Sequence, residues 1–154
     1  MNGFRFSLQT LLDYRMHIEE GLMLKLADHK KVLEEEKKNL GRLQNKELSA
    51  LSELENKAPQ NAMFVSAKIS YITVLRERIN EKVETVACKT REVAEWQKKL
   101  LEAVKQKKML ESLKEKQLRN FRNEVRKRDN KEMDELGNIK FEKGGSREKA
   151  NRYL

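Results

Sequence analysis

Apolar residues recur every three or four positions along most of this 154-residue chain, and this spacing constrains the fold more than any other feature. In the first part of the chain the spacing runs from Leu8 to Leu54, and in the second part from Val65 to Val104. Charged residues, 38% of the total, occupy most of the other positions. A narrow apolar seam on a charged helix is typical of a coiled coil. A broad globular core is not expected, because ordinary domains are only about 25% charged.

The single proline, Pro59, interrupts this pattern near the middle of the chain. Proline cannot continue a helix, and it also biases the preceding residue away from helical geometry. Gly137 fits a helix stop at the far end. The chain is therefore predicted to be a single all-α unit with a helix over about 7–56, a turn over about 57–61, a helix over about 61–137 and a loose basic tail over 138–154.

The two apolar seams match each other if the chain folds back at Pro59. Residues whose numbers add to about 119 then face each other, so that Leu40 meets Ile79 and Leu26 meets Val93. This match favours a long two-helix antiparallel coiled-coil hairpin over two straight chains that pair in parallel. The seam expected on the second helix consists of Val65, Ile69, Ile72, Arg76, Ile79, Val83, Val86, Thr90, Val93, Gln97, Leu100 and Val104.

The second helix is predicted to outrun the first. In this register the first helix ends near Leu8, opposite Glu111, and residues beyond about 113 have no partner within the hairpin. Apolar residues nevertheless continue there, so the overhanging C-terminal helix is expected to bind a partner. The alternative is that it frays or self-associates as in a crystal contact. Tyr71 and Leu75 are expected beside the seam, where they either widen the helix contact or form a docking patch.

The net charge of +9 lies entirely after residue 58, because residues 1–58 carry equal numbers of basic and acidic side chains. Such an asymmetry indicates an acidic partner, which can be a nucleic acid, a membrane surface or a protein. Direct nucleic-acid binding is disfavoured, because few aromatic residues accompany the basic ones. A basic coiled coil that binds nucleic acid or the ribosome remains the alternative from a different functional class.

No pattern of catalytic or metal-binding residues is visible. His17 and His29 lack a second His or Cys at ligand spacing, and Cys88 lacks the partners of a catalytic nucleophile. His29 is expected to face Thr90 in the seam, and Cys88 is expected to point outward. No glycine-rich phosphate loop occurs, and no apolar run approaches the roughly 18 residues of a membrane span. We therefore expect a non-enzymatic protein with no cofactor, no metal and no small-molecule substrate.

Two segments resemble the FliJ family of flagellar export proteins. Residues 4–15 read Phe-Arg-Phe-Ser-Leu-Gln-Thr-Leu-Leu-Asp-Tyr-Arg, similar to the Phe-x-Phe-x-Leu-x-x-Leu-Leu opening of that family. Residues 105–117, followed by Asn-Lys-Glu-Met-Asp-Glu-Leu at 130–136, resemble its C-terminal pattern. The length, the mid-chain break and the basic second half agree as well. The resemblance therefore covers nearly the whole chain.

The resemblance implies a cytoplasmic, non-enzymatic stalk or adaptor of the flagellar type III export apparatus. Such a protein inserts into the ring of the export ATPase, promotes ring assembly, and contacts the export-gate membrane protein and the export chaperones. Its place at the inner face of the cell membrane, at the flagellar base, then comes from these partners. The stalk of a virulence type III secretion system is the alternative within the same class.

The resemblance also implies candidate binding residues. Those for the export ATPase lie toward the two ends of the chain and are Leu8, Leu12, Arg15, Leu118, Phe121, Val125, Arg126 and Met133. Those for the export gate lie on the second helix and opposite it, and are Tyr71, Leu75, Ile79, Leu40 and Leu43.

Overall fold

The computed structural model describes the backbone of residues 3–57 and 61–150, and the side chains of residues 3–56 and 61–141. Two helices, α1 (Gln9–Lys57) and α2 (Ala62–Ala150), make up nearly all of the described chain, which contains no strand. The chain divides into two compact units, one of Tyr14–Lys105 and one of Met1–Asp13 with Gln106–Leu154. Each helix contributes to both units. The predicted all-α helical hairpin is confirmed.

The break between the helices falls where the proline predicted it. α1 ends at Lys57 and α2 begins at Ala62, while Pro59 itself lies outside the described residues. Asn61 caps α2, because its side-chain Oδ1 accepts a hydrogen bond of 3.0 Å from the backbone N–H of Met63. Asparagine is among the best residues at this position, since its oxygen satisfies a backbone donor that the first helical turn leaves free.

The predicted end of the second helix at Gly137 is wrong, because α2 continues to Ala150. A glycine ends a helix when it adopts a positive φ, and none of the described glycines has one. A glycine inside a helix costs only about 1 kcal/mol relative to alanine. The helix-forming residues on both sides of Gly137 therefore carry the helix through it, and the predicted loose tail is helical up to residue 150.

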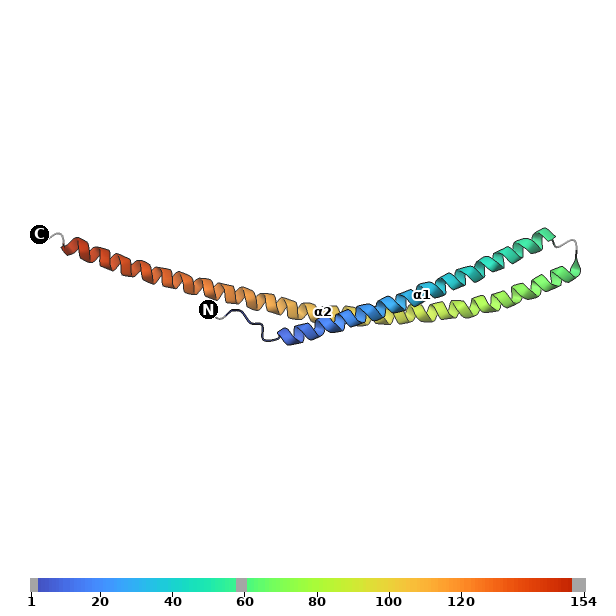
Figure 1. The fold of residues 1–154 in the computed structure, drawn as a ribbon, viewed down its shortest axis with the longest axis horizontal. Coiled ribbons are helices and arrows are strands. Elements are labelled where there is room, and N and C mark those ends of the chain that lie inside the picture. The colour runs from blue at the N-terminus through green and yellow to red at the C-terminus, as the bar shows by residue number, and fades with distance from the viewer. Residues whose placement is uncertain (1–2, 58–60, 151–154) are drawn as a thin grey trace. The chain divides into compact units, whose positions relative to one another are not determined.

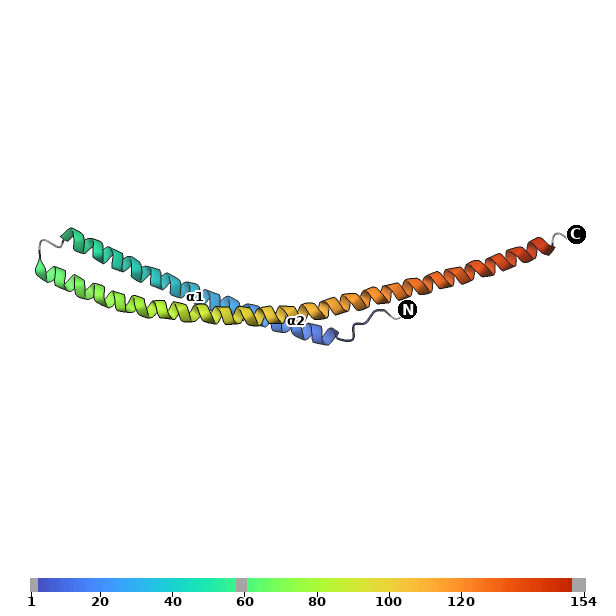
Figure 2. The same cartoon turned by 180° about the vertical axis from the view of Figure 1, so that it is seen from behind.

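In the unit of Tyr14–Lys105, α1 and α2 lie side by side and run antiparallel (Figures 1 and 2). Leu26, Leu33 and Val93 form a buried cluster, and three partly buried residues pack against it, namely Val86, Trp96 and Leu100. These contacts agree with the predicted register. On α1, every predicted seam position after Leu8 is buried or half-buried, so the α1 seam is confirmed.

Five of the twelve predicted seam positions on α2 are wrong by one residue. Ile69, Arg76, Val83, Thr90 and Gln97 are exposed, and the buried or half-buried positions are Lys68, Leu75, Lys82, Lys89 and Trp96. At the last position Val104 is half-buried and its neighbour Ala103 is buried, while the exposed Arg76 still reaches Glu47 of α1 in an ion pair. Leu75, expected beside the seam, is buried within it. The number of apolar residues does not distinguish the predicted seam from the observed one, because each set of twelve positions contains nine apolar residues. The observed one places Leu75 and Trp96 against α1 in place of Arg76 and Gln97.

Lysine is tolerated at these seam positions because two of the three lysines form ion pairs with glutamates of α1. Lys68 Nζ lies 2.5 Å from Glu53 Oε2, and Lys82 Nζ lies 2.6 Å from Glu36 Oε2. The lysine stem can cover apolar surface while its ammonium stays at the wet edge. Ion pairs near a protein surface add little stability on average, so we infer that these two pairs help to fix the register of the helices more than they strengthen the fold.

In the other unit, the segment before α1 packs along α2. The Phe4 ring lies 5.8 Å from the Phe121 ring, and Phe6 is buried. Lys114 Nζ donates a hydrogen bond of 2.8 Å to Gln9 Oε1. The prediction that residues beyond about 113 have no partner is therefore wrong. Residues 3–8 are not helical, and non-helical chain reaches further per residue than the 1.5 Å rise of a helix.

Candidate interaction surfaces

The predicted ATPase-binding residues are unequally accessible. In the unit that contains both chain ends, Leu12 is buried, while Leu118, Phe121 and Val125 are half-buried. Leu8, Arg126 and Met133 are exposed, and Met133 is 69% exposed. Arg15 belongs to the other unit and is half-buried. The structure thus brings most of these residues into one unit, and Leu12 is a packing residue within it.

An exposed apolar surface follows Val125 on α2. Every described side chain from 126 to 141 is exposed, including four large apolar ones, Met133, Leu136, Ile139 and Phe141. Met133, Leu136 and Ile139 are three residues apart and therefore lie near one another on the helix. Exposed apolar residues that cluster on a charged helix are typical of a surface that binds another protein. The overhanging helix is thus present, but it begins after Val125 and not after residue 113.

Phe4 and Phe6 are functional candidates that periodicity did not reveal. The spacing of apolar residues identifies helical seams, and these two phenylalanines lie outside any helix. Phe4 covers part of α2 at Phe121, and Phe6 is buried. The sequence signal for them is that two phenylalanines stand close together ahead of a charged helix, which is unusual in a chain with only 6% aromatic residues.

Of the five predicted export-gate residues, only Tyr71 is exposed. Leu75 and Ile79 are buried in the seam, and Leu40 and Leu43 are half-buried on α1. Tyr71 is 45% exposed and is therefore the one residue of the five with a large accessible surface.

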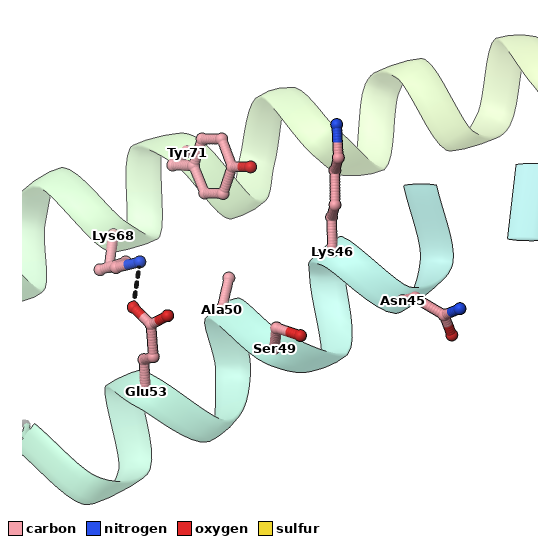
Figure 3. A pocket seen from close by; sticks show the side chains of 7 residues that line it. All are labelled: Asn45, Lys46, Ser49, Ala50, Glu53, Lys68 and Tyr71. Carbon is pink, nitrogen blue, oxygen red and sulfur yellow. Dashed lines mark ion pairs between the residues drawn. The ribbon is translucent and has the colours of Figure 1, made fainter. Parts of the chain in front are cut away.

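Tyr71 borders an open hollow between the two helices (Figure 3). The hollow is lined by Asn45, Lys46, Ser49, Ala50, Glu53, Lys68 and Tyr71. The Lys68 ammonium lies 5.7 Å from the centre of the Tyr71 ring and 5.8 Å from that of Phe64, while also pairing with Glu53. A cation held over an aromatic face stabilises both groups. The aromatic patch beside the hollow is therefore anchored by one lysine.

A second polar cluster surrounds His29 and Trp96. The two rings stack with centroids 5.2 Å apart, and His29 Nδ1 lies 3.5 Å from Glu92 Oε2. Lys25 and Lys99 each place an ammonium over the Trp96 ring. His29 therefore meets Trp96 and Glu92, and not Thr90 as predicted, because Thr90 lies outside the seam.

Lys89 sets the ionisation of Glu92 in this cluster. Its ammonium donates hydrogen bonds of 3.1 and 3.0 Å to the two carboxylate oxygens of Glu92. These hydrogen bonds lower the pKa of Glu92 and raise the pKa of Lys89. Cys88 is exposed, as predicted, and its Sγ lies 3.9 Å from Glu92 Oε1. The described side chains contain no group of three His, Cys, Asp or Glu residues that could hold a metal ion.

The structure is a two-helix scaffold with exposed apolar and aromatic residues. The family model described as "Flagellar FliJ protein" matches residues 4–146. The chain belongs to the FliJ family. It is thus a component of flagellar protein export, and the family assignment favours the flagellar system over a virulence one.

FliJ proteins are non-catalytic components of the export apparatus. No curated protein and no solved structure matches this chain. Neither helix, within the described residues, is apolar over a length that could cross a membrane.

Proposed function

We propose that this FliJ-family chain is the non-enzymatic stalk of the flagellar type III export ATPase. In this role it inserts into the ATPase ring, promotes ring assembly, and links the ring to the export gate and the export chaperones. It would act in the cytoplasm, held at the inner face of the cell membrane by these partners. The match of the family model over residues 4–146 carries the proposal.

The exposed part of α2 supports a contact with the ATPase. Met133, Leu136 and Ile139 are exposed on a helix whose net charge is positive, and α2 also carries the half-buried Phe121 and Val125. Burying such apolar residues against a partner contributes roughly 25 cal/mol for each Å² removed from water. A single helix with this composition fits a narrow opening lined by other subunits.

The test is to assay the purified export ATPase with and without this protein. We expect the protein to raise ATP turnover and to increase the fraction of ATPase found in rings. Met133→Asp should reduce both effects, because a charge would replace an exposed apolar contact. Met109→Asp is the matched control, since Met109 is 72% exposed on the same helix. Unchanged turnover and ring formation on adding the wild-type chain would reject the proposal.

Tyr71 supports the contact with the export gate, because its exposed ring is held in place by Lys68. Tyr71→Ala should weaken co-purification with the export-gate protein without altering ATPase stimulation. Tyr14→Ala is the matched control, because Tyr14 is also exposed, but on α1. Equal loss with both variants would argue against a specific site at Tyr71.

A further inference from the structure

A straight line of basic and polar side chains, here called the basic stripe, runs along α2 between residues 106 and 130. Its members follow one another at intervals of three or four residues, and they are Lys108, Ser112, Lys116, Arg119, Asn123, Arg126 and Asn130. All seven side chains are exposed. Lys108 and Asn130 are 22 residues apart, which is about six helical turns, so the stripe runs nearly parallel to the helix axis.

The positive charge of residues 106–130 is concentrated on the side of α2 that carries the basic stripe. Because successive residues turn by about 100°, each side chain can be placed on one half of the helix or the other. The half centred on the stripe carries one acid, Glu115, and six basic residues, which are Lys108, Lys116, Arg119, Arg122, Arg126 and Lys127. The other half carries three basic and three acidic residues, which are Lys107, Lys114, Arg128, Glu111, Glu124 and Asp129. The net charge is therefore +5 on the stripe side and zero on the other side.

The rest of this unit packs against α2 on the side away from the basic stripe. Every half-buried side chain of residues 106–130 lies on that side, including Phe121, whose ring meets Phe4. A basic residue there also has a partner, because Lys107 Nζ lies 4.0 Å from Glu111 Oε1. The basic residues of the stripe, in contrast, form no ion pair or hydrogen bond within the described part of the chain. They are therefore accessible to an external anionic surface.

We propose that the basic stripe binds the surface of an anionic phospholipid membrane, with α2 lying along that surface. A flat surface touches a cylinder along one line, and the four basic residues of the stripe lie along such a line over about 27 Å. Lys and Arg close to an anionic leaflet are attracted to its headgroups. The Ser and Asn side chains between them can donate hydrogen bonds to phosphate oxygens. No apolar residue belongs to the stripe, so α2 would rest on the headgroups without inserting.

The composition of the basic stripe favours a membrane over a protein or a nucleic acid. The core of a protein interface is rich in apolar and aromatic residues, and the stripe has none. Single-stranded nucleic acid is bound by aromatic residues on which its bases stack. A helix in the major groove of a duplex has a phosphate backbone on each side, so it needs basic residues along both flanks. A single line of basic residues fits a flat anionic surface instead.

This membrane contact goes beyond the proposed function, in which partner proteins alone hold the chain at the membrane. Arg126 belongs both to the basic stripe and to the candidate ATPase-binding residues. A ring that encloses α2 would cover the stripe as well, so the chain would leave the membrane surface before it enters the ring. Membrane binding itself requires no ATPase, and the proposal does not rest on the stalk function.

The test is cosedimentation of the full chain with vesicles over a range of lipid concentrations. One set of vesicles is equimolar phosphatidylglycerol and phosphatidylcholine, and the other is phosphatidylcholine alone. We expect binding to the anionic vesicles only, and release by added salt, because the stripe has no apolar residue that could insert. A variant with Lys108→Gln, Lys116→Gln and Arg119→Gln should bind the anionic vesicles at least about tenfold more weakly.

The control variant carries Lys30→Gln, Lys31→Gln and Lys38→Gln, which alter three exposed lysines of α1. It should bind like the wild type, although both variants lower the net charge of +9 by the same three charges. Circular dichroism should show equal helix content in all chains, since every altered side chain is exposed.

Three outcomes would overturn the proposal. The first is a wild type that does not bind the anionic vesicles, and the second is an equal loss of binding in both variants. The third is duplex DNA that binds the chain more tightly than the anionic vesicles do at the same salt concentration. No readout involves the ATPase, so the proposed function is tested separately.

Discussion

The ring of Phe4 lies 5.8 Å from the ring of Phe121 and is tilted by 48° to it. This contact attaches the non-helical start of the chain to α2, next to the hydrogen bond between Lys114 and Gln9. Tilted aromatic pairs contribute about 0.5–1.5 kcal/mol beyond the area they bury. The pair therefore holds the start of the chain in place over α2.

Phe4→Ala should release this segment. We expect the local free energy of opening to fall by about 1 kcal/mol, because the aromatic contact is lost. Faster amide hydrogen exchange at the start of α1, near Leu12, would report it. Met109→Ala serves as the control, since Met109 is an exposed residue of the same unit. Equal exchange rates in wild type and Phe4→Ala would contradict the role given to this contact.

Leu75→Ala tests the corrected seam of α2. Leu75 is 3% exposed, so its truncation should lower the free energy of unfolding by about 2–5 kcal/mol. Ile69→Ala should cost far less, because Ile69 is 52% exposed. Thermal unfolding followed by circular dichroism measures both. A larger loss for Ile69→Ala would restore the seam predicted by counting apolar residues.

Glu92→Gln tests the ion pair with Lys89 through its pH dependence. The folded pKa of Glu92 is lowered below the ordinary 4.5, so its stabilising contribution is present above that value and is lost as the pH falls through the folded pKa. The wild type should exceed the variant in melting temperature at neutral pH. This difference should shrink as the medium is acidified below 4.5. A constant difference at all pH values would contradict it.

The raised pKa of Lys89 gives the complementary expectation at the alkaline end. Its stabilising contribution is complete below the ordinary 10.5 and is lost as the pH rises through the higher folded pKa. Lys89→Met, which removes the charge but keeps an apolar stem, should therefore differ most from the wild type below 10.5. Melting temperatures at a series of alkaline pH values measure this.

Gly137→Ala should strengthen the last part of α2. No described atom lies within 4 Å of a Cβ placed at Gly137, and its φ is not positive. The substitution should therefore stabilise the helix locally by up to about 1 kcal/mol. Slower amide exchange at residues 138–141 would show the gain. Faster exchange there would mean that Gly137 ends the helix, as first predicted from the sequence.

Heptad spacing and one proline were sufficient to predict most of the fold. They predicted both helices, their antiparallel register and the seam of α1, because a period near 3.5 fixes which side of a helix is buried. They did not fix the second seam, since Ile69 and Val83 compete with Leu75 and Trp96 on equal apolar counts. Glutamates on α1 favour the observed seam by meeting Lys68 and Lys82, and such cross-helix pairs are invisible in one helix alone.

The candidate sites were harder to predict than the fold. The residues came from a family resemblance, which aligns positions but says nothing of exposure. For that reason the resemblance implied Leu75, Ile79 and Leu12 as binding residues, although their side chains are buried. The covering of Phe121 by Phe4 depends on a non-helical segment, and helical periodicity cannot place such a segment.

The contacts beside the turn, next to the Asn61 cap of α2, predict the order in which the fold forms. Glu53 and Lys68 are 15 residues apart in the chain, whereas Phe4 and Phe121 are 117 residues apart. The entropy lost in closing a loop grows with its length, so contacts beside the turn should form before those between the chain ends. Pulsed amide labelling during refolding should protect residues near Ala50 before those near Leu12. The two helices would then pair progressively from the turn toward the chain ends, and Phe4 would dock last.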